Sequence, residues 1–209
     1  MATESAPLIV TYVLIGINVL VSLAGFAAMR KGIEGEKFLF IPFQVSAGRN
    51  LLGMLLSHFS HADGAHLLFN MMSLYFFAPV VEGGLGAASL LAIYVISGGF
   101  SSAFVYYFHR KNPEYRSLGA SGSVSGVIFA SIVLQPGMSI YFFLIPIPIP
   151  GPVFAILYIA ISTFFMRRQM GNISHEAHIG GAVSGFLLAG LLSSEGFQPL
   201  LDRIKELLP

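Results

Sequence analysis

Long stretches of this 209-residue chain carry almost no charge. Lys, Arg, Asp and Glu together make up 10% of the residues and hydrophobic residues make up 55%, whereas ordinary soluble domains carry roughly 25% charged residues. A water-soluble fold with so little charge could not cover its surface, so lipid must be the solvent for much of the chain. The sequence therefore predicts an integral, multi-pass membrane protein that has the lipid bilayer as a partner.

Six segments are apolar enough, or nearly so, to cross the bilayer, because a spanning helix needs about 20 mainly apolar residues. They are residues 7–29, 66–81, 87–108, 121–134, 153–166 and 177–192. The last three are short, and a short helix is viable in a bundle when irregular backbone at its end is buried or lines a water-filled cavity. The expected fold is an all-α membrane protein, a six-transmembrane-helix bundle that forms a single domain of residues 1–209.

Three other segments have a distinct character. Residues 30–64 mix basic residues with apolar clusters, which favours a partly membrane-embedded loop with a short amphipathic helix. Residues 145–152 alternate Ile and Pro before Gly-Pro, so we expect an extended connection, because Pro removes a donor and fixes φ. Residues 1–7 lack a basic region, and the apolar stretch after them is too long for a signal-peptide core, which predicts a retained helix.

Two features of the composition narrow the function. The chain has no cysteine, which excludes thiol catalysis, disulfides and cysteine zinc sites. Its net charge of +1 argues against a nucleic-acid partner. We expect no cofactor and no metal.

Polar groups are costly in hydrocarbon, so their clusters indicate where function lies. The first cluster comprises His58, His61, His66 and Asn70. His66 and Asn70 are four residues apart, so on a helix they share a face and can both donate hydrogen bonds toward one point. The alternative is that buried polar residues here hold helices together.

The second cluster is the sequence Gly119-Ala120-Ser121-Gly122 at the start of an apolar segment. Ser121 thus lies near a helix N-terminus, where free backbone N–H groups and the helix dipole favour a developing anion. The alternative is structural, because Gly122 and Gly126 form a helix-packing pattern in which serine is common. Taken alone, this motif is explained better by packing.

The third cluster comprises His175, His178, Gly180, Gly181 and Gly185. Gly181 and Gly185 are four residues apart and form a flat face beside His178. That face permits close approach to the glycine face of the serine helix, which would bring His178 toward Ser121. A serine hydroxyl needs a base within hydrogen-bond reach, and histidine is the usual base near neutral pH. His175 lies in the expected loop before this helix and is expected to be solvated.

Together the clusters supply a nucleophile, a base and oxyanion donors. Asp63 and Asp202 are the only aspartates, so the arrangement would be a dyad, and the two membrane aspartates of an aspartyl protease are lacking. A histidine metal site or metal transporter is an alternative, because two His pairs have the i, i+3 spacing suited to ligation. Their nearby acids are only Asp63 and Glu176, and the pattern His-Glu-x-x-His is absent.

The ordered set of motifs, which covers about residues 49–192, resembles the rhomboid family of intramembrane serine proteases. The motifs that carry the resemblance are His61, His66 and Asn70 in the second helix, Gly119, Ser121 and Gly122 at the start of the fourth, and His178, Gly180 and Gly181 in the sixth. The resemblance implies a water-filled cavity that opens to one membrane face. It also implies hydrolysis of single-span membrane protein substrates in or near their transmembrane segments.

The resemblance further implies a role for each site residue. Ser121 would be the nucleophile and His178 the base. The oxyanion hole would comprise His66, Asn70 and the backbone N–H of Ser121, and the supporting residues would be Gly119, Gly122 and His61. Residues 167–177 would cap the cavity, and the fifth helix would be a lateral gate. A catalytically inactive, client-binding relative is the alternative function, although such relatives typically lose the serine or the histidine.

The sequence departs from the family pattern in three places. Gly48-Arg49 stands where the family often has Trp-Arg. Ser125 stands where an aromatic side chain often packs on the catalytic histidine, so another side chain must orient His178. Nine of the 11 Lys and Arg residues lie in connections on one side, which by the positive-inside rule places the active-site face in the cytoplasm. Bacterial relatives usually expose that face outside. We expect a bacterial cytoplasmic (inner) membrane location.

Overall fold

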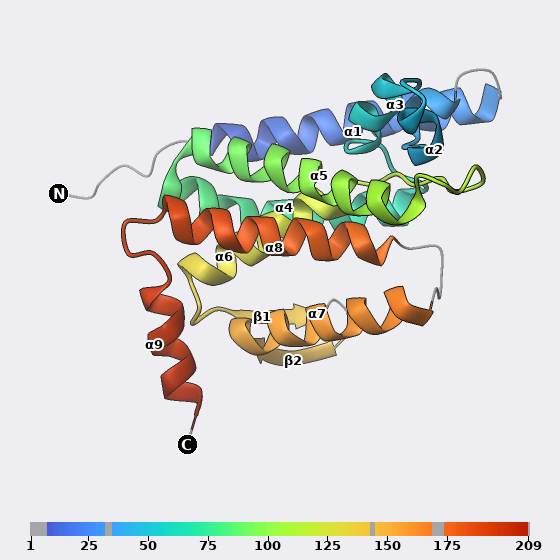
Figure 1. Ribbon diagram of the computed structural model, residues 1–209. Coiled ribbons are helices and arrows are strands. Elements are labelled where there is room, and N and C mark those ends of the chain that lie inside the picture. The colour runs from blue at the N-terminus through green and yellow to red at the C-terminus, as the bar shows by residue number, and fades with distance from the viewer. Residues whose placement is uncertain (1–7, 32–34, 143–144, 169–173, 209) are drawn as a thin grey trace.

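The computed structural model describes residues 8–31, 35–142, 145–168 and 174–208, and its long helices run side by side in a bundle (Figure 1). The elements are α1 (Ile9–Lys31), η1 (Gly35–Phe38), α2 (Pro42–Ser46), α3 (Leu51–Ser57), α4 (Gly64–Leu85), α5 (Ala87–His109), α6 (Ser121–Leu134), β1 (Ser139–Phe142), β2 (Ile145–Pro150), α7 (Gly151–Arg168), α8 (His175–Leu192) and α9 (Gln198–Leu207). Helices occupy all six expected segments, the first of them from Ile9 onward, and the protein is predominantly helical.

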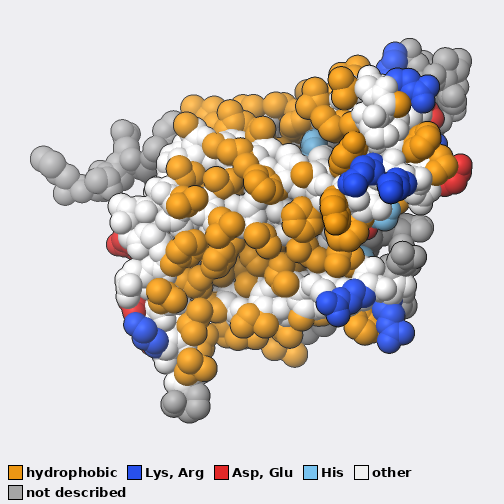
Figure 2. Space-filling model, in the orientation of Figure 1, with side chains coloured by type: hydrophobic (Ala, Val, Ile, Leu, Met, Phe, Trp, Pro, Cys, Tyr) orange, Lys and Arg blue, Asp and Glu red, His pale blue; other side chains and the backbone are white. Residues whose placement is uncertain are grey.

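Four of these helices are long and apolar enough to cross a membrane. They are residues 9–30 of α1 and the helices α4, α5 and α7. Hydrophobic side chains cover the flank of the bundle (Figure 2), and some are largely exposed, for example Leu20 (69%) and Ile156 (70%). This surface suits a membrane protein, but the expected count of six spanning helices is not confirmed. At 14 residues α6 is shorter than the spanning helices, and within the described residues α8 is not among the candidates.

The helix α6 lies at the centre of the bundle. Its residues from Gly122 to Val133 are all buried, and it packs against α4, α5 and α8. A helix that is apolar on every side belongs in an interior. The position of α6 therefore places Ser121, its half-buried first residue, at one end of this buried helix.

Helices α6 and α8 meet through glycines. A Cβ atom on Gly181 would overlap the backbone of Gly122, and one on Gly185 would overlap the backbone of Gly126. Such small residues let two helix backbones approach closely. The predicted contact between the two glycine faces is confirmed.

Several helix boundaries differ from those expected. Helix α4 begins at Gly64 because the Asp63 carboxylate caps it, accepting a hydrogen bond of 2.8 Å from the His66 N–H. Helix α7 begins at Gly151, so the expectation that residues 151–152 are extended was wrong. Pro152 is tolerated in a first turn, where its missing N–H has no partner to lose. Helix α8 begins at His175, two residues before the expected start at residue 177.

The fold is predominantly helical, as expected, but β1 and β2 form an antiparallel hairpin before α7 that was not predicted. Ile140 pairs with Ile149, and Ser139 pairs with Pro150. The Ile-Pro alternation suits a strand with one free edge, since only every second residue can donate a backbone hydrogen bond. Residues 145–150 are thus extended, as predicted, but as part of a sheet.

Two further regions depart from the expectation. The segment before α4 contains η1, α2 and α3 in place of one short helix. Helix α9 was not predicted, and it leaves the bundle at a steep angle (Figure 1). Leu200 of α9 is buried, and Ile204 packs against the core, whereas Asp202 is exposed. This pattern is that of an amphipathic helix.

The start of α1 is held by a buried carboxylate from α4. Glu82 is 5% exposed, and it accepts hydrogen bonds from the N–H groups of Val10 and Thr11 (both 2.8 Å) and from the Thr11 hydroxyl (2.6 Å). A carboxylate at a helix N-terminus is favoured by the free donors and by the helix dipole. Glu82 therefore ties α1 to α4 at the end of the bundle remote from Ser121.

Candidate active site

The backbone before Ser121 is held by the segment that precedes α4. Phe40 and Ser117 exchange two backbone hydrogen bonds of 2.8 and 3.1 Å, and the Gly119 N–H donates to the Ser57 carbonyl at 2.9 Å. No side chain caps the start of α6 at Ala120. The N–H groups of the first turn have no acceptor within the helix, so Ser121 begins a helix whose donors remain available for an anion.

Ser121 and His178 form a hydrogen bond. The Nε2 atom of His178 lies 2.8 Å from the Oγ atom of Ser121, although the two residues are 57 apart in sequence. His178 lies in the first turn of α8 and is half-buried. The structure thus brings together the two residues that the sequence singled out, at a distance suited to proton transfer.

Gly119 makes room for His66 beside the serine. Its φ of 138° is in a region that favours glycine, and a Cβ atom there would lie 2.7 Å from Cε1 of His66. The same Cβ position lies 3.6 Å from the Oγ atom of Ser121. The His66 ring and the Ser121 hydroxyl therefore border one small space.

Asn70 lies one turn after His66 on α4, and it is 7% exposed. Its Nδ2 atom donates to the carbonyl of His66 at 3.2 Å, and this leaves one of the two amide hydrogens uncommitted by that bond. His66 and Asn70 thus lie on one helix, as predicted, and the Asn70 amide donates one hydrogen bond to the backbone of that helix.

The ring of His61 contacts the ring of His66. His61 is fully buried, its Nδ1 atom lies 2.8 Å from the Ser22 hydroxyl, and its ring meets that of His66 edge-on at 4.9 Å. The pKa of His61 is lowered to about 4, chiefly because burial disfavours the charged ring. His61 is therefore held neutral, in a fixed orientation, next to a predicted oxyanion donor.

One residue near the dyad was not predicted. The ring of Tyr158, on α7, lies 6.1 Å from the ring of His178, and its hydroxyl lies 2.6 Å from the Ser125 hydroxyl. Sequence reasoning noted only that Ser125 replaces an aromatic residue and that another side chain must orient His178. Nothing in the sequence identified Tyr158, because the contact depends on how α7 packs.

His175 does not lie in a solvated loop, as was expected. It is the first residue of α8, its ring stacks on Phe165 at 5.3 Å, and it meets His178 edge-on at 6.0 Å. The expected cap loop falls largely on residues 169–173, which lie outside the described residues.

A cluster of polar side chains connects the end of α5 to the start of α8. His109 bonds to Glu176, the ring of Tyr115 stacks on His109 at 3.6 Å, and the Tyr115 hydroxyl lies 2.7 Å from that of Ser174. Burial raises the pKa of Tyr115 to about 12, so its hydroxyl stays protonated. Lys and Arg side chains gather at this end of the bundle, with a further group over α9 (Figure 2).

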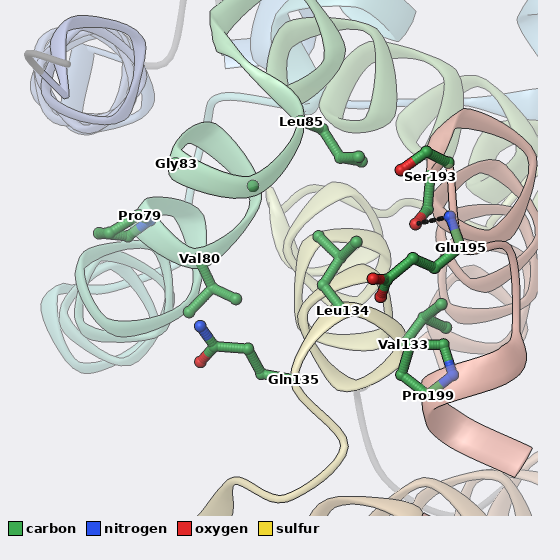
Figure 3. Close-up of a pocket in the computed structure, with 12 residues that line it drawn as sticks. Pro79, Val80, Gly83, Leu85, Val133, Leu134, Gln135, Ser193, Glu195 and Pro199 are labelled. Carbon is green, nitrogen blue, oxygen red and sulfur yellow. Dashed lines mark hydrogen bonds between the residues drawn. The ribbon is translucent and has the colours of Figure 1, made fainter. Parts of the chain in front are cut away.

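Two cavities lie away from Ser121 and His178. One, of about 390 Å³, lies between the ends of α4 and α6 and the start of α9, with Val80, Gln135 and Glu195 around it (Figure 3). The other, of about 500 Å³, is mainly apolar and lies between α3 and α5, beside His58. Across the described ranges, no group of three His, Asp or Glu side chains is placed to hold a metal ion.

Comparison with known proteins identifies the family of this chain. The rhomboid domain matches residues 48–195, which include every residue described at the dyad. The chain therefore belongs to the rhomboid family.

Three relatives illustrate the match. The chain is 29% identical to RHOMBOID-like protein 12, mitochondrial, of Arabidopsis thaliana (79% of this chain, 54% of the relative). It is 28% identical to Rhomboid protein 1, mitochondrial, of Saccharomyces cerevisiae (91% and 55%) and 28% identical to Rhomboid protease AarA of Providencia stuartii (87% and 71%). The chain spans about half the length of the first two. Because these two are mitochondrial, the expectation of a bacterial inner membrane is not supported.

Proposed function

We propose that this chain is an intramembrane serine protease that uses a Ser121–His178 dyad to hydrolyse peptide bonds in or near transmembrane segments. The observation that carries the proposal is the 2.8 Å contact between the Ser121 hydroxyl and the His178 imidazole at the start of two packed helices. Membership of a family in which a relative is named a protease supports it.

Each residue has a role in this proposal. His178 accepts the proton of Ser121 as the hydroxyl attacks the scissile carbonyl, and it returns a proton to the leaving amine. Water then hydrolyses the acyl-enzyme. His66, Asn70 and the Ser121 N–H donate to the oxyanion, which is the step at which such donors contribute most. These steps require neither a cofactor nor a metal.

The remaining site residues support this chemistry. Gly119 keeps the space between His66 and Ser121 open, because any Cβ atom there would meet the His66 ring. Gly122 leaves room for the Ser101 side chain of α5, and its backbone is the surface against which Gly181 of α8 packs. His61 fixes the ring of His66 through their edge-on contact.

The substrates in this proposal are single-span membrane proteins. Helix α7, which is the fifth of the six predicted helices, is the lateral gate. A peptide bond inside a stable helix is shielded by its own hydrogen bonds, so a substrate must unwind locally before Ser121 can reach it. Gly or Pro near the cut lowers that cost by about 1 to 3 kcal/mol. Small residues at the cut suit a site bordered by Gly119, Ala120 and Gly122.

The test uses the purified chain in liposomes with a panel of single-span substrates and a fluorophosphonate probe. The wild type should cleave substrates that carry a helix-breaker near the cut and should be labelled by the probe, whereas Ser121→Ala should do neither. Ser123→Ala is the matched control, because Ser123 is a buried serine of the same helix turn. Undiminished cleavage by Ser121→Ala would overturn the assignment. A wild type that binds these substrates without labelling or cleavage would indicate the client-binding alternative.

A further inference from the structure

The ring of Tyr158 is fixed from two sides. Its hydroxyl lies 2.6 Å from the Ser125 Oγ atom, and its ring meets that of Phe129 edge-on at 5.4 Å. Both partners belong to α6, the helix that Ser121 begins. Tyr158 itself belongs to α7, so its contacts with α6 hold α7 against the serine helix.

A chain of hydrogen bonds connects this tyrosine to the nucleophile. The Ser125 hydroxyl donates to the backbone carbonyl of Ser121 at 2.7 Å. A serine hydroxyl has one hydrogen, so Ser125 must accept from Tyr158. The Tyr158 hydroxyl is therefore bound, through one serine, to the residue that carries the proposed nucleophile.

The ring of the same tyrosine lies beside the proposed base. Its centroid is 6.1 Å from that of His178, with 35° between the planes. The ring of His175 meets the ring of His178 edge-on, at 6.0 Å. Apart from the 2.8 Å bond to Ser121, the imidazole thus depends on ring contacts for its orientation, since no carboxylate is bonded to it in the described structure.

We propose that Tyr158 is a positioning residue that holds the imidazole of His178 in line with Ser121, and that α7 supplies it in place of the serine helix. This inference rests on the proposed function. Because Tyr158 comes from α7, displacement of that helix would remove both the ring beside His178 and the hydrogen bond to Ser125. The dyad is then fully ordered only while α7 is packed against α6.

The experiment compares Tyr158→Leu, Tyr158→Phe and the control Phe164→Leu, which alters an exposed aromatic residue of the same helix. A loosely held base costs on the order of 10- to 100-fold in rate, so kcat of Tyr158→Leu should fall by that factor. Its fluorophosphonate labelling rate should fall in parallel while KM changes by less than about twofold, because no substrate contact is lost. Tyr158→Phe keeps the ring and should lose less than about fivefold, roughly the value of one hydrogen bond. Phe164→Leu should match the wild type.

A rescue variant separates positioning from mere stability. In Tyr158→Leu with Ser125→Tyr, the ring is supplied from α6 toward the same space, and most of the lost labelling rate should return. Wild-type kcat per folded molecule in Tyr158→Leu would overturn the proposal, as would a loss that follows only the fraction unfolded.

Ring NMR of labelled histidines tests the positioning independently of cleavage. The His178 ring should become mobile in Tyr158→Leu and remain ordered in Phe164→Leu. A wild type that neither cleaves nor labels would overturn the proposed function alone, and the NMR comparison would still decide the role of Tyr158. An unchanged His178 ring would contradict that role.

Discussion

A Cβ atom on Gly181 would lie within the van der Waals envelope of the Gly122 carbonyl oxygen. Helix α8 can pack at this distance from α6 only because Gly181 has no side chain at the contact. Both residues lie within one turn of the dyad, so this contact sets the separation of the helix starts that carry Ser121 and His178. The geometry of the proposed active site is thus a consequence of backbone packing.

Gly181→Ala should therefore lower both stability and activity. The added methyl must push α8 away from Gly122, and overpacking of this kind costs about 1–3 kcal/mol. The melting temperature in detergent should fall, and turnover per folded molecule should fall with it. Gly99→Ala is the matched control, because nothing lies within 4 Å of its Cβ position. That change should raise stability by up to about 1 kcal/mol, since alanine is the better helix former. Equal effects of the two substitutions would contradict the packing account.

His178, and not His175, is predicted to be the base. His178→Ala should reduce kcat by several orders of magnitude, and adding Ser121→Ala should cost little more, because nucleophile and base act as a unit. His175→Ala removes the stacking on Phe165 and should have a much smaller effect. Steady-state cleavage of one model substrate by all the variants gives the answer. An inactive His175→Ala together with an active His178→Ala would exchange the two roles.

Asn70 is predicted to act in turnover and not in substrate binding. Loss of one oxyanion donor typically lowers kcat about 10²- to 10³-fold, so Asn70→Ala should show that loss with a nearly unchanged KM. Asn18→Ala offers the opposite pattern, because buried Asn18 bonds to Tyr94 and to the Leu14 carbonyl. It should lower the melting temperature and leave kcat per folded molecule intact. If Asn70→Ala behaved like Asn18→Ala, Asn70 would be structural.

Acid should destabilise the fold through the histidines of the segment between α3 and α4. Burial lowers the pKa of His58 and of His61 from 6.5 to about 4, so each binds a proton more readily when the protein is unfolded. Their contribution to the free energy of unfolding is therefore complete above pH 6.5 and is lost as the pH falls toward 4. Between pH 7 and pH 5 the loss should be about 2 kcal/mol per histidine.

Thermal unfolding in detergent at these two pH values checks this prediction. The variant His58→Gln cannot titrate, and its side chain can still bond to Ser102, the 2.9 Å partner of His58. Its melting temperature should fall less than that of the wild type on acidification. Identical acid sensitivity of the two proteins would show that His58 is not involved.

The features that could be predicted from the sequence are those that local sequence patterns determine. Apolar runs located α1, α4, α5, α6, α7 and α8, and glycine spacing predicted that the helices of Ser121 and His178 would meet. Asp63 is a recognisable helix cap, and it could have placed the start of α4 correctly. The β-hairpin and Tyr158 could not be predicted in the same way. A two-stranded sheet depends on pairing between segments, and the contact of Tyr158 with Ser125 joins residues 33 positions apart.

In the proposed function, the length of α6 sets the depth in the membrane at which a peptide bond would be cut. Its 14 residues rise about 21 Å, whereas the hydrocarbon layer is about 30 Å thick. If the far end of α6 meets one boundary of that layer, Ser121 lies about 9 Å inside the other, a depth equal to roughly six helical residues. A substrate cut at the boundary of its transmembrane segment would have to move deeper into the membrane to reach Ser121, or the lipid layer above Ser121 would have to become thinner. A substrate cut about six residues inside its transmembrane segment would require neither change.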